Sequence, residues 1–176
     1  MFELRKLLAT QKDFADTVTH KPKYKDYVFA MNIEISEFMN CLPWKWWKKQ
    51  QNTNKERVLD ELADVLAFWL SYYIGYFAEY RKMRILTPEE SSEDIERMTD
   101  LLQYHLNAIH KPTRVADLSD FNYPSSLTMT NITFSGFLIS KLCSYAMYYT
   151  NCSILEIIDA YHKKMVINHE RQKTNY

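Results

Sequence analysis

The sequence predicts an all-α protein, and three features of its 176 residues lead to this prediction. Apolar residues recur every three or four positions along most of the chain, whereas strand-like alternation is scarce. The chain has only two glycines, and its five prolines fall between the periodic segments. We therefore expect a single domain over residues 1–176, a bundle of about six helices with a four-helix core.

The first three expected helices cover residues 2–19, 25–42 and 54–82, with a proline in each of the two connections. Each helix carries an apolar stripe at helical spacing, which predicts one face turned to the core. The stripes include Leu4, Leu7, Leu8, Phe14 and Val18, then Val28, Met31, Ile35, Phe38 and Leu42, then Leu59, Leu62, Val65, Leu66 and Phe68.

The last three expected helices cover residues 89–110, 128–150 and 153–171. The first of them has a clear start signal, Thr87-Pro88-Glu89-Glu90, with a capping hydroxyl, a proline at the first helical position and carboxylates near the positive helix end. Residues 111–127 contain two prolines and several Asp, Ser and Asn residues, so we expect an irregular connection there.

Charge and composition exclude several classes of protein. Lys and Arg together number 22, as do Asp and Glu, so no net charge attracts the chain to nucleic acid or to an anionic membrane. The two glycines are far apart, which excludes glycine-rich phosphate loops. The longest apolar run, residues 65–78, is shorter than the roughly 20 residues of a membrane span. Three scattered cysteines and a charged N-terminal segment lead us to expect a cytoplasmic protein.

Two pairs of carboxylates lie on helices that are otherwise apolar. Glu34 and Glu37 share one face of the second helix, and Glu61 and Asp64 are three residues apart on the third. Four such charges repel one another and are costly to desolvate, so they require a cation. Because only oxygen ligands are in register, Mg²⁺ is favoured over Mn²⁺ or Ca²⁺. We therefore expect a metal site between these two helices.

Polar residues also interrupt the first and last helices. Gln11 lies in the middle of the first apolar stripe, where a buried amide must find hydrogen-bonding partners. In the last helix, Lys164, Asn168 and Arg171 share one face with Tyr161. Such a face fits a ligand with a hydrogen-bonding ring and a polyphosphate tail, although a solvated surface would also explain it.

Tryptophans alternate with lysines between the second and third helices, in Trp44-Lys45-Trp46-Trp47-Lys48-Lys49. Aromatic rings beside ammonium groups can stack a base and hold phosphates. A plug that closes the end of the bundle is the alternative interpretation.

Taken together, these residues resemble the dimeric all-α dUTP diphosphatases of the all-α nucleoside-triphosphate pyrophosphatase superfamily. The carboxylate pairs alone indicate the superfamily, and Gln11 with the polar face of the last helix indicates the dUTP branch. Met165 and Asn175 depart from the family pattern. The resemblance is carried by Gln11, Glu34-Ile35-Ser36-Glu37, Trp44-Lys45-Trp46-Trp47, Asp60-Glu61-Leu62-Ala63-Asp64 and residues 161–176.

The resemblance implies a homodimer that hydrolyses dUTP to dUMP and pyrophosphate with Mg²⁺. It also implies a role for each candidate residue. Glu34, Glu37, Glu61 and Asp64 would bind the metal, and Glu34 would accept the proton of the attacking water; Gln11 and Asn168 would contact the uracil; Trp44 and Trp47 would pack around the nucleoside; and Lys45, Lys164 and Arg171 would neutralise the phosphates.

Two alternatives remain open at the level of sequence. One is a broader pyrophosphohydrolase that acts on dCTP or on modified nucleotides. The other is a helical scaffold without catalytic activity, in which the carboxylates only pair with lysines. Tyrosine-rich helix faces, such as Tyr145, Tyr148 and Tyr149, suit a subunit interface as well as a core.

Overall fold

The computed structural model describes residues 3–20, 22–45, 47–49, 51–83, 96, 99–100, 103 and 132–174. Within these ranges the secondary structure is entirely helical, which confirms the predicted all-α class. The helices are α1 (Leu4–Thr17), α2 (Tyr24–Asn40), α3 (Lys55–Met83), α5 (Ile132–Thr150) and α6 (Ile154–Lys173). The helix expected at 89–110 lies mostly outside the described residues, although positions 96, 99, 100 and 103 are helical. The connection expected at 111–127 lies outside them altogether.

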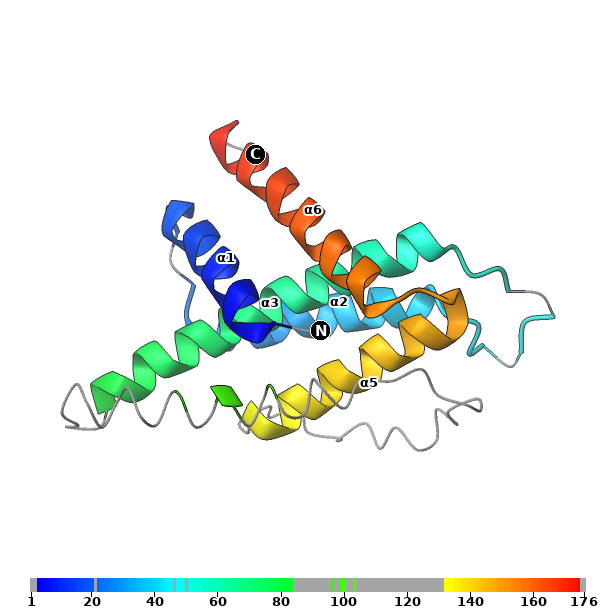
Figure 1. Ribbon diagram of the computed structural model, residues 1–176, viewed down its shortest axis with the longest axis horizontal. Helices are drawn as coiled ribbons and strands as arrows, with labels where there is room; N and C mark the ends of the chain where they lie inside the picture. The colour runs from blue at the N-terminus through cyan, green and yellow to red at the C-terminus, as the bar shows by residue number, and fades with distance from the viewer. Residues whose placement is uncertain are drawn as a thin grey trace.

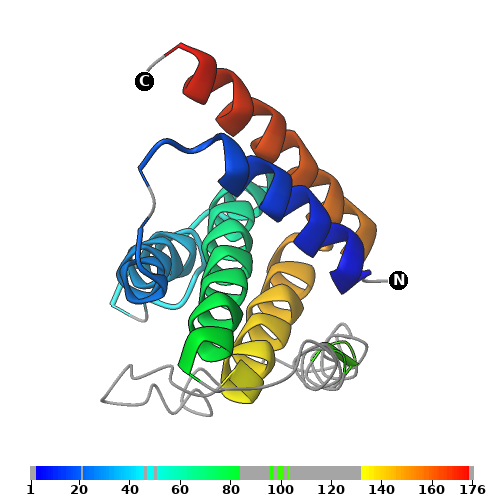
Figure 2. The same ribbon diagram turned by 90° about the vertical axis from the view of Figure 1, so that its left-hand side faces the viewer.

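Helix α3 is the centre of the arrangement, because it contacts α1, α2, α5 and α6. Helix α2 packs along it, α5 lies beside it, and α1 and α6 cross over it next to one another (Figures 1 and 2). The longest apolar run of the sequence falls within α3, and its residues from Val65 to Tyr73 are buried apart from the partly buried Phe68. Of the helices in the described ranges, none combines the length and the apolar character needed to cross a membrane.

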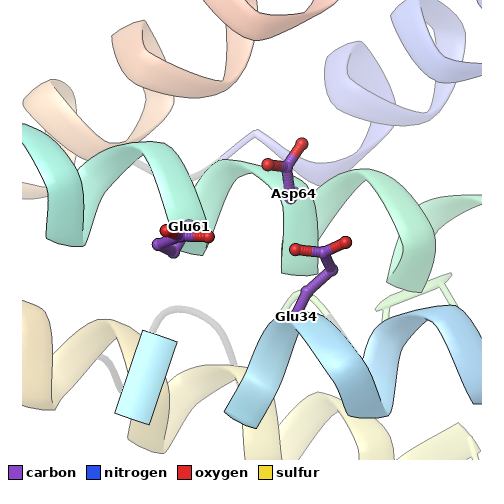
Figure 3. Close-up of side chains that lie close together, drawn as sticks. All are labelled: Glu34, Glu61 and Asp64. Carbon is purple, nitrogen blue, oxygen red and sulfur yellow. The ribbon is translucent and has the colours of Figure 1, made fainter. Parts of the chain in front are cut away.

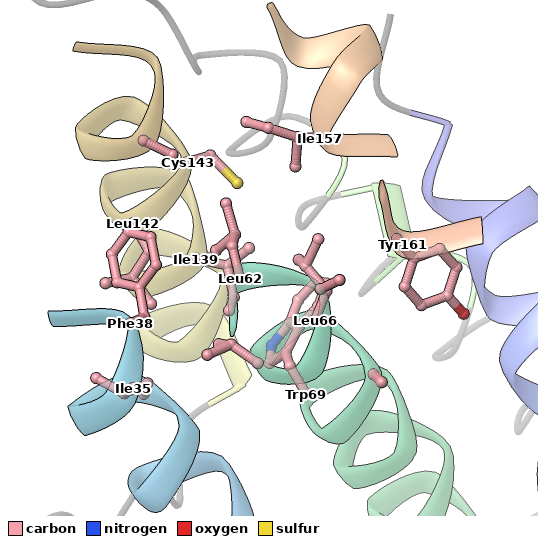
Figure 4. Close-up of a cluster of buried hydrophobic side chains, with 14 of the residues drawn as sticks. Ile35, Phe38, Leu62, Leu66, Trp69, Ile139, Leu142, Cys143, Ile157 and Tyr161 are labelled. Carbon is pink, nitrogen blue, oxygen red and sulfur yellow. The ribbon is translucent and has the colours of Figure 1, made fainter. Parts of the chain in front are cut away.

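The core is formed where α3 meets its neighbours. Leu62, Leu66 and Trp69 of α3 are completely buried. Side chains of the other helices surround them (Figure 4), among them Ile35, Phe38, Ile139, Leu142, Cys143, Ile157 and Tyr161. Each fully buried Leu or Ile side chain contributes about 1.5–3 kcal/mol through removal from water. The buried Trp69 Nε1–H donates a 3.0 Å hydrogen bond to Ser135 Oγ of α5, so the indole is not left unsatisfied.

The start of α6 is fixed by a capping box. Ser153 Oγ accepts from the Glu156 backbone N–H at 3.2 Å, and the Ser153 N–H donates to the Glu156 carboxylate at 2.8 Å. Just before it, Asn151 adopts φ 56°, a left-handed conformation that Asn tolerates better than most residues. The chain therefore reverses between α5 and α6. Because Glu156 also pairs with Lys55 at the start of α3, α6 is anchored to the helix that it crosses.

Candidate metal and nucleotide site

Three carboxylates from α2 and α3 form an acidic cluster. Glu34 of α2, with Glu61 and Asp64 of α3, can each offer one oxygen such that the three oxygens lie within 4.8 Å of one another. Figure 3 shows the Glu34 side chain extending from α2 toward α3, where Glu61 and Asp64 lie about one turn apart. The close packing of α2 on α3 brings the three together, as their core-facing spacing suggested. This acidic cluster could hold a metal ion.

The charges of the acidic cluster are only partly compensated by cations of the fold. Burial raises the pKa of Glu34 to about 7, and the neighbouring carboxylates, Asp64 first, add to this effect. Burial also raises the pKa of Glu61, although Arg57 lies 3.4 Å away and opposes the increase. Among the described residues, the Glu34 carboxylate has neither an ion pair nor a hydrogen bond. A divalent cation bound here would relieve this repulsion, so the donor set fits such an ion.

Glu37, the fourth predicted ligand, lies one turn after Glu34 on α2. It is exposed and is not one of the three residues whose oxygens converge. Its negative charge is nevertheless close enough to raise the pKa values of Glu34 and Glu61. Coordination by Glu37 therefore stays a prediction.

Lys164 of α6 supplies a positive charge at one edge of the acidic cluster. Its Nζ lies 2.7 Å from Asp64 Oδ2 and 2.9 Å from Asp60 Oδ1, and the residue is only 8% exposed. Burial disfavours the charged ammonium, but the hydrogen bonds to the two aspartates outweigh it, so the pKa of Lys164 is raised. Burial raises the pKa of Asp64, and the contact with Lys164 opposes this increase only in part, so the pKa stays above its ordinary value.

A cavity of about 310 Å³ extends from Asp64 between α1, α3 and α6. Its apolar walls include Phe14 of α1, Val18 directly after α1, and Phe68 of α3. Four of its polar lining residues were predicted from the sequence: Gln11, Asp64, Asn168 and Arg171. Ser71 and Gln172 line it as well. The structure thus brings Gln11, Asn168 and Arg171 to one cavity that begins at the acidic cluster.

Gln11 is buried, with an exposed fraction of 1%, and both ends of its amide have partners. Nε2 donates to Ser71 Oγ at 2.9 Å, and the Tyr161 hydroxyl donates to Oε1 at 3.0 Å. The sequence offered two interpretations of this residue, an amide satisfied within the core and an amide that faces a ligand. The structure combines them, because Gln11 is hydrogen-bonded and also lines the cavity.

The tryptophan-lysine segment lies elsewhere in the described part of the structure. The rings of Trp44 and Trp47 pack edge to face, with their centroids 5.4 Å apart. Lys45 Nζ lies 5.8 Å from the Trp44 ring centroid. Lys45 lines a separate cavity of about 230 Å³ with Lys48 and Gln51. None of these side chains is among the described residues that line the 310 Å³ cavity, so their contact with a nucleoside stays a prediction.

The contacts of three residues in this region were not predicted from the sequence. Arg57 is four residues before Glu61, and Ser71 is seven residues after Asp64, so helical spacing could have placed both on the face of α3 that carries the carboxylates. Asp60 is exposed, but it accepts a hydrogen bond from Lys164. Nothing in the sequence pattern indicates that last contact, because it depends on how α6 crosses α3.

The fold and site define a helical protein whose acidic cluster could hold a metal and adjoins a partly apolar cavity. A family model described as dUTPase matches residues 3–176, and the chain belongs to this all-α dUTPase family. Members of the family are metal-dependent hydrolases of nucleotide metabolism that act on dUTP. Among curated proteins, no match to the chain is found.

Proposed function

We propose that this protein hydrolyses dUTP to dUMP and pyrophosphate in a Mg²⁺-dependent reaction. The main support is the position of Asp64, which belongs both to the acidic cluster and to the lining of the cavity with Gln11 and Asn168. An ion held by the cluster would therefore lie next to a nucleotide held in the cavity. This adjacency is what cleavage of a phosphate chain requires.

We assign Mg²⁺ to the acidic cluster because all of its candidate ligands are carboxylates. Glu34, Glu61 and Asp64 would hold the ion, and Glu37 would join them from the exposed edge. Oxygen-only ligands suit a hard cation. When bound, Mg²⁺ would supply positive charge for the phosphate oxygens and lower the pKa of the attacking water.

Glu34 is the candidate general base. Its pKa of about 7 in the metal-free fold makes it a carboxyl that gains a proton readily near neutral pH. In the proposed reaction a water oxygen forms a bond to one of the two phosphorus atoms joined by the α–β bridging oxygen, and a Glu34 carboxylate oxygen takes the water proton. The bond from that phosphorus to the bridging oxygen breaks, and dUMP and pyrophosphate separate.

The remaining candidates bind the nucleotide in this proposal. Gln11 and Asn168 contact the uracil, while Arg171 and Lys164 neutralise phosphate oxygens. Lys45, Trp44 and Trp47 contact the nucleotide from the segment after α2. In that case they must approach the cavity when substrate binds, since they do not line it in the described structure.

A panel of nucleotides tests the proposal directly. With Mg²⁺ present, we expect pyrophosphate release from dUTP at a kcat/KM well above that for dCTP, dTTP or modified nucleotides. Equal rates for dUTP and dCTP would instead support the broader pyrophosphohydrolase. If folded protein releases no pyrophosphate from any nucleotide and binds neither Mg²⁺ nor a non-hydrolysable dUTP analogue, the scaffold alternative is correct.

We also propose that the protein works as a homodimer in the cytoplasm. Large apolar side chains are exposed on α2 and on α6, and a second subunit could cover them on either helix: Phe29, Ile33, Leu155, Val166 and Ile167. The three cysteines are free, which suits a reducing compartment. Sedimentation equilibrium tests the dimer, and a monomer at micromolar concentration would contradict it.

A further inference from the structure

A buried network of three side chains surrounds the amide of Gln11. Gln11 of α1, Ser71 of α3 and Tyr161 of α6 have exposed fractions of 1%, 7% and 0%. Gln11 Nε2 donates to Ser71 Oγ at 2.9 Å, and the Tyr161 hydroxyl donates to Gln11 Oε1 at 3.0 Å. Three helices are therefore joined through one amide, and all three side chains are buried, where hydrogen bonds are stronger than in water.

The two partners of the amide differ in whether they prefer its oxygen end or its nitrogen end. An aliphatic hydroxyl donates and accepts about equally well, so Ser71 alone would satisfy either end of the amide. A phenol donates more readily than it accepts, because its oxygen lone pair is delocalised into the ring. Tyr161 therefore favours the orientation that places Oε1 toward its hydroxyl. The hydroxyl can also donate its single proton to the Leu7 carbonyl oxygen at 3.3 Å, but its bond to Gln11 Oε1 at 3.0 Å is the shorter one.

This orientation matters for the choice of base. Each end of the Gln11 amide keeps one unused bonding position, an acceptor on Oε1 and a hydrogen on Nε2. Uracil presents an acceptor at position 4 beside a donor at N3, whereas cytosine presents a donor beside an acceptor. An amide fixed in one orientation can match only one of these edges at a given position, whereas an amide free to turn over can match both.

Tyr161 itself is not part of the cavity lining that would face the base. Gln11 and Ser71 line the 310 Å³ cavity, and Tyr161 is not among the described residues that do. Any effect of its hydroxyl on the choice of base must therefore pass through the amide.

We propose that Tyr161 is a positioning residue that sets the preference for uracil over cytosine by holding the Gln11 amide in one orientation. The inference rests on the proposed function, and it adds a residue and a cause for the selectivity of that site. Ser71 keeps the amide in place but does not choose its orientation.

The test compares kcat/KM for dUTP and dCTP in wild type and in Tyr161→Phe. We expect the dUTP/dCTP ratio to fall by about tenfold or more, because one fixed buried hydrogen bond is lost and the amide can turn over. In a Gln11→Ala background, Tyr161→Phe should leave the ratio unchanged, since the amide through which Tyr161 acts is gone.

Tyr73→Phe is the matched control. Tyr73 is also buried, and its hydroxyl is hydrogen-bonded to Thr99 Oγ1 at 2.8 Å, away from the cavity lining. Tyr73→Phe removes the same hydroxyl group from the same helical core. Because that hydroxyl is not hydrogen-bonded to Gln11, the dUTP/dCTP ratio should stay within about twofold of wild type. An equal fall in the ratio for both variants would show a general structural effect and overturn the inference.

Ser71→Ala tests the inference even if Tyr161→Phe does not fold. Because Tyr161 would still hold Oε1, we expect Ser71→Ala to keep the uracil preference within about threefold. Loss of that preference in Ser71→Ala, or its retention in folded Tyr161→Phe, overturns the inference while the proposed function stands. Wild-type protein without dUTP turnover overturns the proposed function itself.

Discussion

Glu61 shows why single carboxylates matter in this protein. Its side chain is 12% exposed, and it lies close to Glu34 and Asp64, so it contributes both a metal ligand and repulsion. We expect Glu61→Gln to reduce kcat/KM for dUTP by at least about a hundredfold, because the amide removes the negative charge that attracts the cation. Circular dichroism should show unchanged helicity.

The control for this variant is Glu56→Gln. Glu56 is an exposed acid in the first turn of the same helix, and it does not belong to the acidic cluster. It should retain activity within about twofold. Full activity in Glu61→Gln would contradict the metal assignment, since the two variants change charge equally.

Glu34 gives the metal-free protein a characteristic pH dependence. Its folded-state pKa of about 7 exceeds the ordinary value of 4.5, so between these values the folded state binds more protons than the unfolded state. Stability should therefore fall as pH rises from about 4.5 through 7. Thermal melts in EDTA should show this fall, and Glu34→Gln should reduce it, whereas Glu56→Gln should not. An unchanged slope in Glu34→Gln would show that this carboxyl is not the one that titrates.

At the scale of secondary structure, the capping box of α6 determines how firmly the helix with Lys164 and Asn168 begins. Ser153→Ala removes the side-chain acceptor for the Glu156 N–H. We expect a loss of about 1 kcal/mol in the free energy of unfolding, measured with urea. Activity below the melting transition should change little, because Ser153 is not among the residues that line the cavity.

Ser36→Ala is a suitable comparison for Ser153→Ala. Ser36 is exposed on α2 and donates only to the Asn32 carbonyl four residues earlier, a bond that does not cap a helix. Its replacement should alter stability by less than about 0.5 kcal/mol. Equal losses of unfolding free energy in the two variants would mean that the helix cap stabilises the protein no more than an ordinary surface hydrogen bond does.

The helices and the acidic cluster could be predicted from sequence for the same reason. A helix fixes the direction of each side chain. The apolar spacing therefore predicted the ends of α2 and α3 to within two residues, and the carboxylate spacing predicted that Glu34 faces Glu61 and Asp64. Contacts that depend on how helices cross carry no such periodicity. The hydrogen bonds of Gln11 with Ser71 and Tyr161 are examples, and so is the position of the segment around Trp44, which has no repeating geometry.

At the scale of the whole molecule, the acidic cluster links metal binding to folding. Its three carboxylates come from two helices that separate when the chain unfolds, so the unfolded chain has no preformed site. A ligand that binds only the folded state stabilises it by RT ln(1 + [L]/Kd), about 2.7 kcal/mol when its concentration is a hundred times Kd. For a chain of this size we expect Mg²⁺ to raise Tm by roughly 5–10 °C above the value in EDTA. Glu61→Gln should lose most of this increase while Glu56→Gln retains it, and an equal increase in both would show that Mg²⁺ acts through general ionic strength instead.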